Sequence, residues 1–128
     1  MIRTGKQYLK GLNDGRQIYI GDELVTDPST HPAFEKGAST FAAIYDLKAD
    51  PKIADVMTFE EEGETFSTYY LRPRSKEDLE KRTRCHRLLA EFSYGLLGRA
   101  PDALGSQITG MAMNPDVFDE AGGYPDHM

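Results

Sequence analysis

Apolar residues recur at helical spacing between Pro32 and Asp50, and this spacing predicts an amphipathic helix. Its buried stripe is predicted to comprise Ala33, Phe34, Ala38, Phe41, Ala42 and Tyr45. We expect the helix to begin near Pro32, with Thr30 or His31 as its cap. It should end at Asp50, because Pro51 follows and a residue before proline is pushed out of the helical region.

A second and longer helical pattern runs from Ser75 to about Leu97. Ser75 and Asp78 have the spacing of a capping box at its start. The face predicted to pack carries Leu79, His86, Leu89, Ala90, Ser93 and Leu97. The other side is basic and carries Lys76, Lys81, Arg82, Arg84 and Arg87. We interpret it as a solvated face with ion pairs to Glu77, Asp78, Glu80 and Glu91. Docking onto an acidic domain or subunit is the alternative.

Shorter patterns complete the predicted fold. Thr4 and Gln7 match a capping box that opens a short helix, which Asn13-Asp14-Gly15 ends. The other predicted elements are a hairpin over 18–25 with a Gly21-Asp22 turn, a hairpin over 57–70 with a solvated glutamate tip at 60–64, a helix from Pro101 to about Met113, and a helix from Asn114-Pro115 that fades at Gly122-Gly123. The chain is therefore predicted to be one mainly α domain over residues 1–128 with two small β-hairpins.

Composition narrows the function without naming it. The 128 residues carry a net charge of -6, which argues against a nucleic-acid partner. No apolar run reaches membrane-spanning length and no signal peptide opens the chain, so we expect no membrane partner and a soluble, cytoplasmic protein. His31, His86 and His127 lack metal-ligand spacing, and no metal is expected. We interpret His31 as a cap or turn residue, His86 as a satisfied histidine at the core edge, and Cys85 as a bystander.

The predicted corner Gly98-Arg99-Ala100-Pro101-Asp102 carries the main candidate for chemistry. Gly98 favours the end of one helix, and Pro101 favours the first position of the next. Arg99 would thus place a permanent guanidinium between two helix ends, where it could bind a carboxylate or a phenolate oxygen. A local pair with Asp102 is the structural alternative.

Three separated stretches give the chain a more specific resemblance. They are Arg3-Thr4-Gly5 with Tyr8 to Leu12 and Ile18 to Asp27, then Thr30-His31-Pro32-Ala33-Phe34, and finally Tyr70 to Leu79 continuing to Gly98-Arg99-Ala100-Pro101-Asp102. In this order they resemble the N-terminal domain of the 4-hydroxyphenylacetate 3-monooxygenase family, the oxygenase component of two-component flavin hydroxylases. The resemblance implies the N-terminal helical domain of an acyl-CoA-dehydrogenase-like enzyme, which forms homotetramers when full length.

The same resemblance implies a reaction and a site. A separate flavin reductase supplies reduced FAD, oxygen adds to the flavin, and a phenolic substrate resembling 4-hydroxyphenylacetate is hydroxylated ortho to its hydroxyl group. Arg99 matches the family arginine that contacts the phenol oxygen, which makes it the catalytic and substrate-binding candidate. Ala103 stands where a tyrosine often shares that contact, so it is a second substrate-binding candidate and puts the particular phenol in doubt. Pro101 and Asp102 are expected to position Arg99.

Family members are several times longer than this chain, which we therefore expect to be the N-terminal fragment of a three-domain enzyme. Most flavin contacts would lie beyond it, its own flavin-binding residues are unknown, and the isolated chain should be inactive. The alternative is a non-catalytic helical interaction module or a remnant without flavin chemistry. A further branch of the superfamily, 4-hydroxybutyryl-CoA dehydratase, places paired cysteines in this domain, whereas this chain has Cys85 alone.

Overall fold

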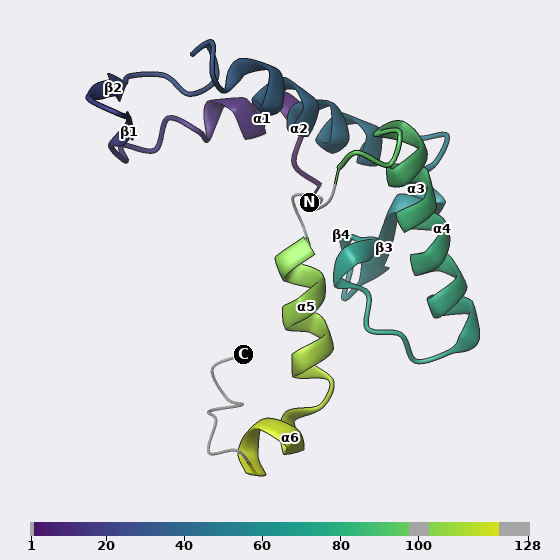
Figure 1. Cartoon of the computed structure of the whole chain (residues 1–128). Helices are drawn as coiled ribbons and strands as arrows, with labels where there is room; N and C mark the ends of the chain where they lie inside the picture. Colours follow the sequence, from purple (N-terminus) through teal and green to yellow (C-terminus); the bar gives the residue numbers. More distant parts are fainter. Residues whose placement is uncertain (1, 98–102, 121–128) are drawn as a thin grey trace. The chain divides into compact units, whose positions relative to one another are not determined.

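The computed structural model describes residues 2–97 and 103–120 of the chain. It divides into two compact units, Met1–Ala54 and Asp55–Met128, and each is described here by itself. The described residues form a mainly helical fold with two small antiparallel hairpins, as the sequence predicts (Figure 1). Whether residues 1–128 form one domain stays a prediction.

The first unit is built on a close pair of helices, α1 (Gly5–Lys10) and α2 (Glu35–Lys48), which lie alongside each other (Figure 1). Glycine at position 5 permits this approach. A Cβ atom there would lie 2.4 Å from the Ala42 carbonyl oxygen and 2.6 Å from Asp46 Oδ2. The Gly5 amide donates a hydrogen bond of 2.7 Å to Asp46 Oδ1, so one carboxylate fixes the start of α1 against α2.

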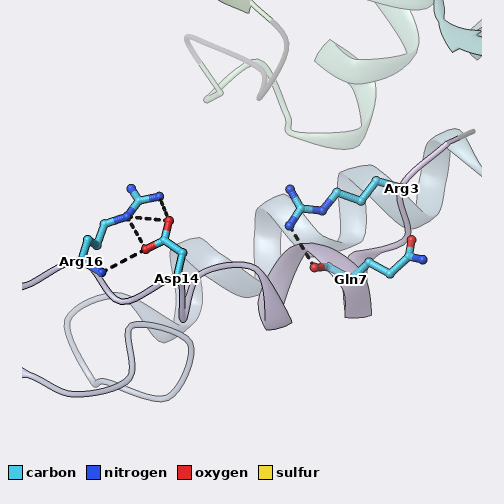
Figure 2. Close-up of polar contacts among 4 residues, drawn as sticks. All are labelled: Arg3, Gln7, Asp14 and Arg16. Atoms are coloured by element: carbon cyan, nitrogen blue, oxygen red, sulfur yellow. Dashed lines mark hydrogen bonds and ion pairs between the residues drawn. The ribbon is translucent and has the colours of Figure 1, made fainter.

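Arg3 holds the outer side of this helix pair. Figure 2 shows its guanidinium donating to the Gln7 carbonyl oxygen, with Nη2 at 3.0 Å. The guanidinium also lies 5.7 Å from the ring centre of Tyr8 and 6.0 Å from that of Tyr45. The two tyrosine rings are stacked with their centres 5.0 Å apart. The predicted capping box of Thr4 and Gln7 is present, so the opening motif has a structural role in this unit.

Two predicted boundaries in the first unit are wrong. The first helix ends at Lys10 with Gly11 as its cap, before Asn13-Asp14-Gly15, where Asp14 instead pairs with Arg16 (Figure 2). The second helix begins at Glu35, not near Pro32, and neither Thr30 nor His31 is its cap.

The cause of the late start of α2 is a turn before it. Asp27 Oδ1 accepts from the Ser29 amide at 2.8 Å, and the His31 carbonyl accepts from the amides of Phe34 and Glu35. Phe34 takes the cap position without a side-chain hydrogen bond. Of the predicted stripe, Ala38 and Ala42 are buried, and Ile44 joins them.

The first hairpin joins β1 (Ile18–Ile20) to β2 (Glu23–Val25), with Ile18 opposite Val25. Gly21 opens its turn with a φ of 58°, a conformation that glycine adopts without strain, so the predicted Gly21-Asp22 turn is confirmed. Val25 is buried, whereas Tyr19 and Leu24 are exposed.

The second unit begins with α3 (Ala54–Met57), whose first residue closes the first unit, and the hairpin of β3 (Thr58–Glu61) and β4 (Glu64–Ser67). The sequence analysis did not predict α3. A 3-10 helix, η1, covers Thr68–Tyr70. The remaining helices are α4 (Lys76–Phe92), α5 (Ala103–Ala112) and α6 (Pro115–Glu120). The buried apolar residues of this unit are Met57, Tyr69, Cys85 and Leu89.

The second hairpin is tighter than predicted. Its turn consists of Glu62 and Gly63 alone, with φ values of 54° and 79°, while Glu60, Glu61 and Glu64 belong to the paired strands. The predicted loop of 60–64 is therefore wrong in extent. Alternation along short strands places glutamates beside Phe59 and Phe66, whose ring centres lie 5.7 Å apart.

Helix α4 starts at the predicted capping box of Ser75 and Asp78 but ends at Phe92, five residues before Leu97. Tyr94 and Gly95 have φ values of 53° and 71°, and this left-handed backbone ends the helix before Gly98 is reached. The predicted packing face is also partly wrong, because Leu79 is 55% exposed whereas Cys85 is buried. The predicted starts and ends of α5 and α6 agree with the structure within two residues, apart from Gly122-Gly123, which lie outside the described residues.

Candidate functional site

The structure places one of the predicted site residues. Ala103 is the first residue of α5 and is partly buried. Arg99, Pro101 and Asp102 lie outside the described residues, and their roles stay predictions. The site is therefore built from the residues on either side of them.

A pocket of about 360 Å³ lies on the second unit next to these positions in the sequence. Leu97 and Ala103, the described residues that flank positions 98–102, both line it. The remaining lining residues are Tyr69, His86, Leu89, Ala90, Ser93, Gly95, Ser106 and Gln107. We call this cavity the His86 pocket. Its volume is within the range of small-molecule sites, about 300–1,000 Å³.

Two hydroxyl groups of the His86 pocket are already hydrogen-bonded. Ser93 Oγ donates to the Leu89 carbonyl oxygen at 2.8 Å. Ser106 Oγ accepts from the Arg82 guanidinium, whose other terminal nitrogen donates to the Leu71 carbonyl oxygen at 2.6 Å. Arg82 thus joins α4 to α5 and to the segment before α4.

His86 contacts the core edge as predicted, but through its ring. Its ring centre lies 4.9 Å from that of Tyr69, edge to face at 72°. Among the described residues, it has no hydrogen-bond partner, so the predicted satisfied histidine is wrong in that respect. Partial burial lowers the pKa of His86, and the nearby Arg82 charge lowers it further. Its imidazole is therefore neutral at pH 7 and can both donate and accept.

Two other pockets lie in the described parts of the chain. One of about 680 Å³ belongs to the second unit and is lined by Phe59, Glu61, Phe66, Tyr70, Arg72, Leu104, Gly105, Ile108, Thr109 and Ala112. One of about 310 Å³ belongs to the first unit and is lined by Tyr8, Leu12, Ile18, Pro28, Ala33, Phe34, Gly37, Ala38 and Phe41. Neither includes a residue that the sequence marks for chemistry.

The basic side of α4 is largely engaged locally. Lys76 pairs with Glu80 at 3.6 Å and Arg87 with Glu91 at 2.9 Å, each one helical turn apart. These pairs confirm the predicted partners Glu80 and Glu91. Asp78 instead accepts from the amides of Arg74 and Ser75, which lowers its pKa and completes the helix cap. Docking through this face stays a prediction.

The other singled-out residues have structural contacts. His31 lies in a turn as predicted, with Nδ1 accepting from the Ala33 amide and Nε2 at 3.2 Å from Glu23. Cys85 is buried with its Sγ 3.7 Å from Met57 Sδ, which fits a packing role. Within residues 2–97 and 103–120, no three His, Cys, Asp or Glu residues are grouped to hold a metal ion. In the same ranges, no helix has both the length and the apolar character to cross a membrane.

The fold and its pocket define a helical substrate-side module of a larger protein class, and the comparisons name that class. Residues 4–128 match the family model of the 4-hydroxyphenylacetate 3-hydroxylase N-terminal region. The chain belongs to this family.

Curated relatives have the same character. The chain is 39% identical over 121 residues to the 4-hydroxyphenylacetate 3-monooxygenase oxygenase component of Thermus thermophilus, covering 94% of this chain and 25% of the relative. It is 42% identical over 102 residues to the oxygenase component of 4-nitrophenol 4-monooxygenase/4-nitrocatechol 2-monooxygenase of Rhodococcus opacus, covering 78% and 19%. The chain thus spans about a quarter or less of the relatives that it matches.

Solved structures confirm the predicted fold class. A crystal structure of the oxygenase component (HpaB) of 4-hydroxyphenylacetate 3-monooxygenase, complexed with FAD and 4-hydroxyphenylacetate, matches with a TM-score of 0.84 and 38% identity. The match covers 91% of this chain and 25% of that one. The chain has the mainly α N-terminal fold of this acyl-CoA-dehydrogenase-like architecture. An archaeal 4-hydroxybutyryl-CoA dehydratase matches at 22% identity and a TM-score of 0.72, a likeness of fold alone.

Proposed function

We propose that this chain is the N-terminal, substrate-side domain of a two-component FADH2-dependent aromatic monooxygenase that hydroxylates a phenol ortho to its hydroxyl group. The observation that carries the proposal is the family match over residues 4–128. The named substrates of relatives are 4-hydroxyphenylacetate, 4-nitrophenol and 2,4,6-trichlorophenol, and all three are single-ring phenols. The His86 pocket, of about 360 Å³, has a volume suited to such a ring.

In this proposal Arg99 binds the phenol oxygen. A guanidinium favours the phenolate form over the phenol, and the phenolate is the more electron-rich ring. Pro101 and Asp102 position Arg99, and Ala103 contributes to the wall next to the substrate. Support for the last assignment is the position of Ala103 in the lining of the His86 pocket. The three other assignments rest on the family resemblance.

The cofactor would be reduced FAD, supplied by a separate reductase. When bound, the flavin activates O2, and one oxygen atom enters the ring while the other leaves as water. The described residues offer little to hold a dinucleotide, because no glycine-rich phosphate loop follows a strand in this sequence. This supports a flavin bound mostly by regions beyond the chain, with this chain's residues orienting the phenol and excluding water.

The wider setting is proposed on the same grounds. The chain would be the first domain of a three-domain enzyme that forms a homotetramer, works with a flavin reductase and resides in the cytoplasm. Reading the natural gene past the codon for Met128 tests the first part. A continuation of several hundred residues supports the enzyme, and a stop codon at that point favours the helical interaction module.

Activity is tested with the full-length protein, a flavin reductase, NADH and FAD. We expect oxygen-dependent hydroxylation of at least one of the three named phenols. Arg99→Ala should leave flavin binding nearly intact, reduce hydroxylation about 100-fold, and increase release of hydrogen peroxide. Arg87→Ala is the matched control, since Arg87 pairs with Glu91 on the surface of α4, and its activity should equal that of the parent.

Each outcome separates the alternatives. Full coupling in the Arg99→Ala enzyme would remove Arg99 from the site. A full-length protein that hydroxylates no phenol, yet binds an acidic protein in a salt-sensitive manner, would replace the enzyme by the interaction module.

A further inference from the structure

The His86 pocket has a defined set of polar groups, and most of them are committed. Ser93 donates to the Leu89 carbonyl, and Ser106 accepts from Arg82. Tyr69 has a further contact of its own besides the His86 ring. His86 and Gln107 have no hydrogen-bond partner among the described residues. They are therefore the lining groups available to a ligand.

His86 is the better suited of the two for a phenol. The Tyr69 ring meets its imidazole edge to face at 4.9 Å, and this contact restricts the ring's orientation. Burial and the charge of Arg82 both lower the pKa of His86, so the imidazole keeps an acceptor nitrogen at neutral pH. Gln107 stands on α5 without a comparable ring contact among the described residues.

The position of the pocket connects His86 to the segment of Arg99. Leu97 and Ala103 line the same cavity as His86, and they immediately precede and follow residues 98–102. Ala103 presents only a methyl group, so it offers a phenol no hydrogen bond. A polar contact on this side of the ring must then come from another lining residue.

We propose that the His86 pocket receives the ring of the phenolic substrate and that His86 accepts a hydrogen bond from the phenol hydroxyl. The inference rests on the proposed function and adds a substrate-contact residue from α4 to it. The ring is held between Ala103 and the apolar wall of Leu89 and Ala90. The imidazole draws the phenol proton toward itself, which increases the phenolate character of the bound ring.

The test uses the full-length protein without reductant, with 4-nitrophenol as the probe, because its absorption band reports ionisation. Binding to the parent should shift the band toward that of nitrophenolate. His86→Phe should raise the Kd about tenfold and abolish the shift, since a charge-neutral hydrogen bond and its desolvated partner are lost. His86→Gln retains an acceptor and should raise the Kd about threefold.

The matched control is His31→Gln, a histidine of the first unit that contacts Glu23 and Ala33. Its Kd should stay within twofold of the parent value. If His86→Phe does not fold, His86→Ala carries the same test, because it truncates a largely exposed side chain. A Kd within twofold of the parent and an unchanged band for the His86 variants would overturn the inference.

The two proposals fail separately. A parent protein that hydroxylates a phenol while the His86 variants bind 4-nitrophenol normally leaves the proposed function standing and removes His86. A parent that neither binds nor hydroxylates any of the three phenols overturns the proposed function and this inference with it.

Discussion

The two units both use a glycine for a close approach, but different atoms stand opposite it. Gly5 in the first unit faces the Ala42 carbonyl oxygen, at 2.4 Å from where a Cβ would lie. Gly105 in the second unit faces the ring of Tyr70, at 2.1 Å from the Cε1 atom. A helix carbonyl cannot move without disturbing α2, whereas Tyr70 is 44% exposed and its ring can turn outward. The first unit is thus fixed by backbone contact, and the second by side chains that can yield.

This difference matches the distribution of pockets and predicted chemistry. The opening motif of the first unit is used for structure: Arg3 stacks on tyrosines, Thr4 caps α1, and Gly5 contacts α2. The second unit has two pockets and the segment of the predicted catalytic residue. Substrate sites require local adjustment, and such adjustment is drawn from the less rigid parts of a protein.

The largest expected effect is that of Gly5→Ala. The added methyl group must displace the Ala42 carbonyl or the Asp46 carboxylate, and such overpacking costs about 3 kcal/mol of unfolding free energy. The measurement is urea unfolding, with hydrogen exchange of the α1 and α2 amides to place the effect in the first unit. Gly37→Ala in α2 is the control, since a Cβ there meets nothing within 4 Å and should stabilise the helix by about 1 kcal/mol. Equal stability of Gly5→Ala and the parent would show that α1 does not contact α2 in this way.

Gly105→Ala should cost less, about 1.5 kcal/mol, because the Tyr70 ring can turn away from the new methyl group. Faster hydrogen exchange should appear in α5 and not in α1 or α2. Gly110→Ala in the same helix is the matched control, since its Cβ meets nothing within 4 Å, and it should be slightly stabilising. A loss as large as that of Gly5→Ala would mean that the second unit is as rigid as the first.

The two capping boxes allow a comparison on equal terms. Thr4→Ala and Ser75→Ala each remove a hydroxyl that accepts from the amide three residues later, at 3.2 Å and 3.1 Å. Each should cost about 1 kcal/mol of unfolding free energy. Amide exchange should rise in the first turn of α1 for one variant and of α4 for the other. Exchange that spreads through both units in either variant would contradict this local effect.

Local chemistry explains which elements could be predicted from the sequence. Capping boxes and the Gly21-Asp22 turn depend on residues within three positions of one another, and the structure has them where the sequence indicates. The end of α4 was missed because Tyr94 adopts a left-handed backbone that tyrosine rarely takes. The Gly95 next to it was the available signal.

The candidate site was less accessible to sequence reasoning because its parts are distant in the chain. The His86 pocket combines η1, α4 and α5, and periodicity alone placed His86 among packing residues. The ring contact with Tyr69 and the role of Arg82, which bonds to both Leu71 and Ser106, depend on tertiary packing. No spacing rule predicts such contacts, and they decide that His86 is neutral and without a hydrogen-bond partner in the described residues.

The smallest expected effect is the pH dependence that His86 contributes. Its pKa is lowered in the folded chain from an ordinary value of about 6.5, mainly by burial and then by Arg82. Below the ordinary pKa the unfolded chain therefore binds a proton more readily than the folded chain does. This contribution to stability is fully present above about pH 7 and is lost as the pH falls below it. His86→Phe should flatten the stability profile between about pH 5 and 7, as measured by thermal unfolding.

A direct titration of the His86 ring by NMR sharpens this prediction and returns to the contrast between the units. Arg82→Met keeps most of the length of the side chain but removes the charge, so the pKa of His86 should rise part of the way back. The remaining depression would then measure burial against Tyr69. A pKa of 6.5 or above in the parent chain would show that the second unit opens its pocket to water, and His86 would lose the neutral state that phenol binding requires.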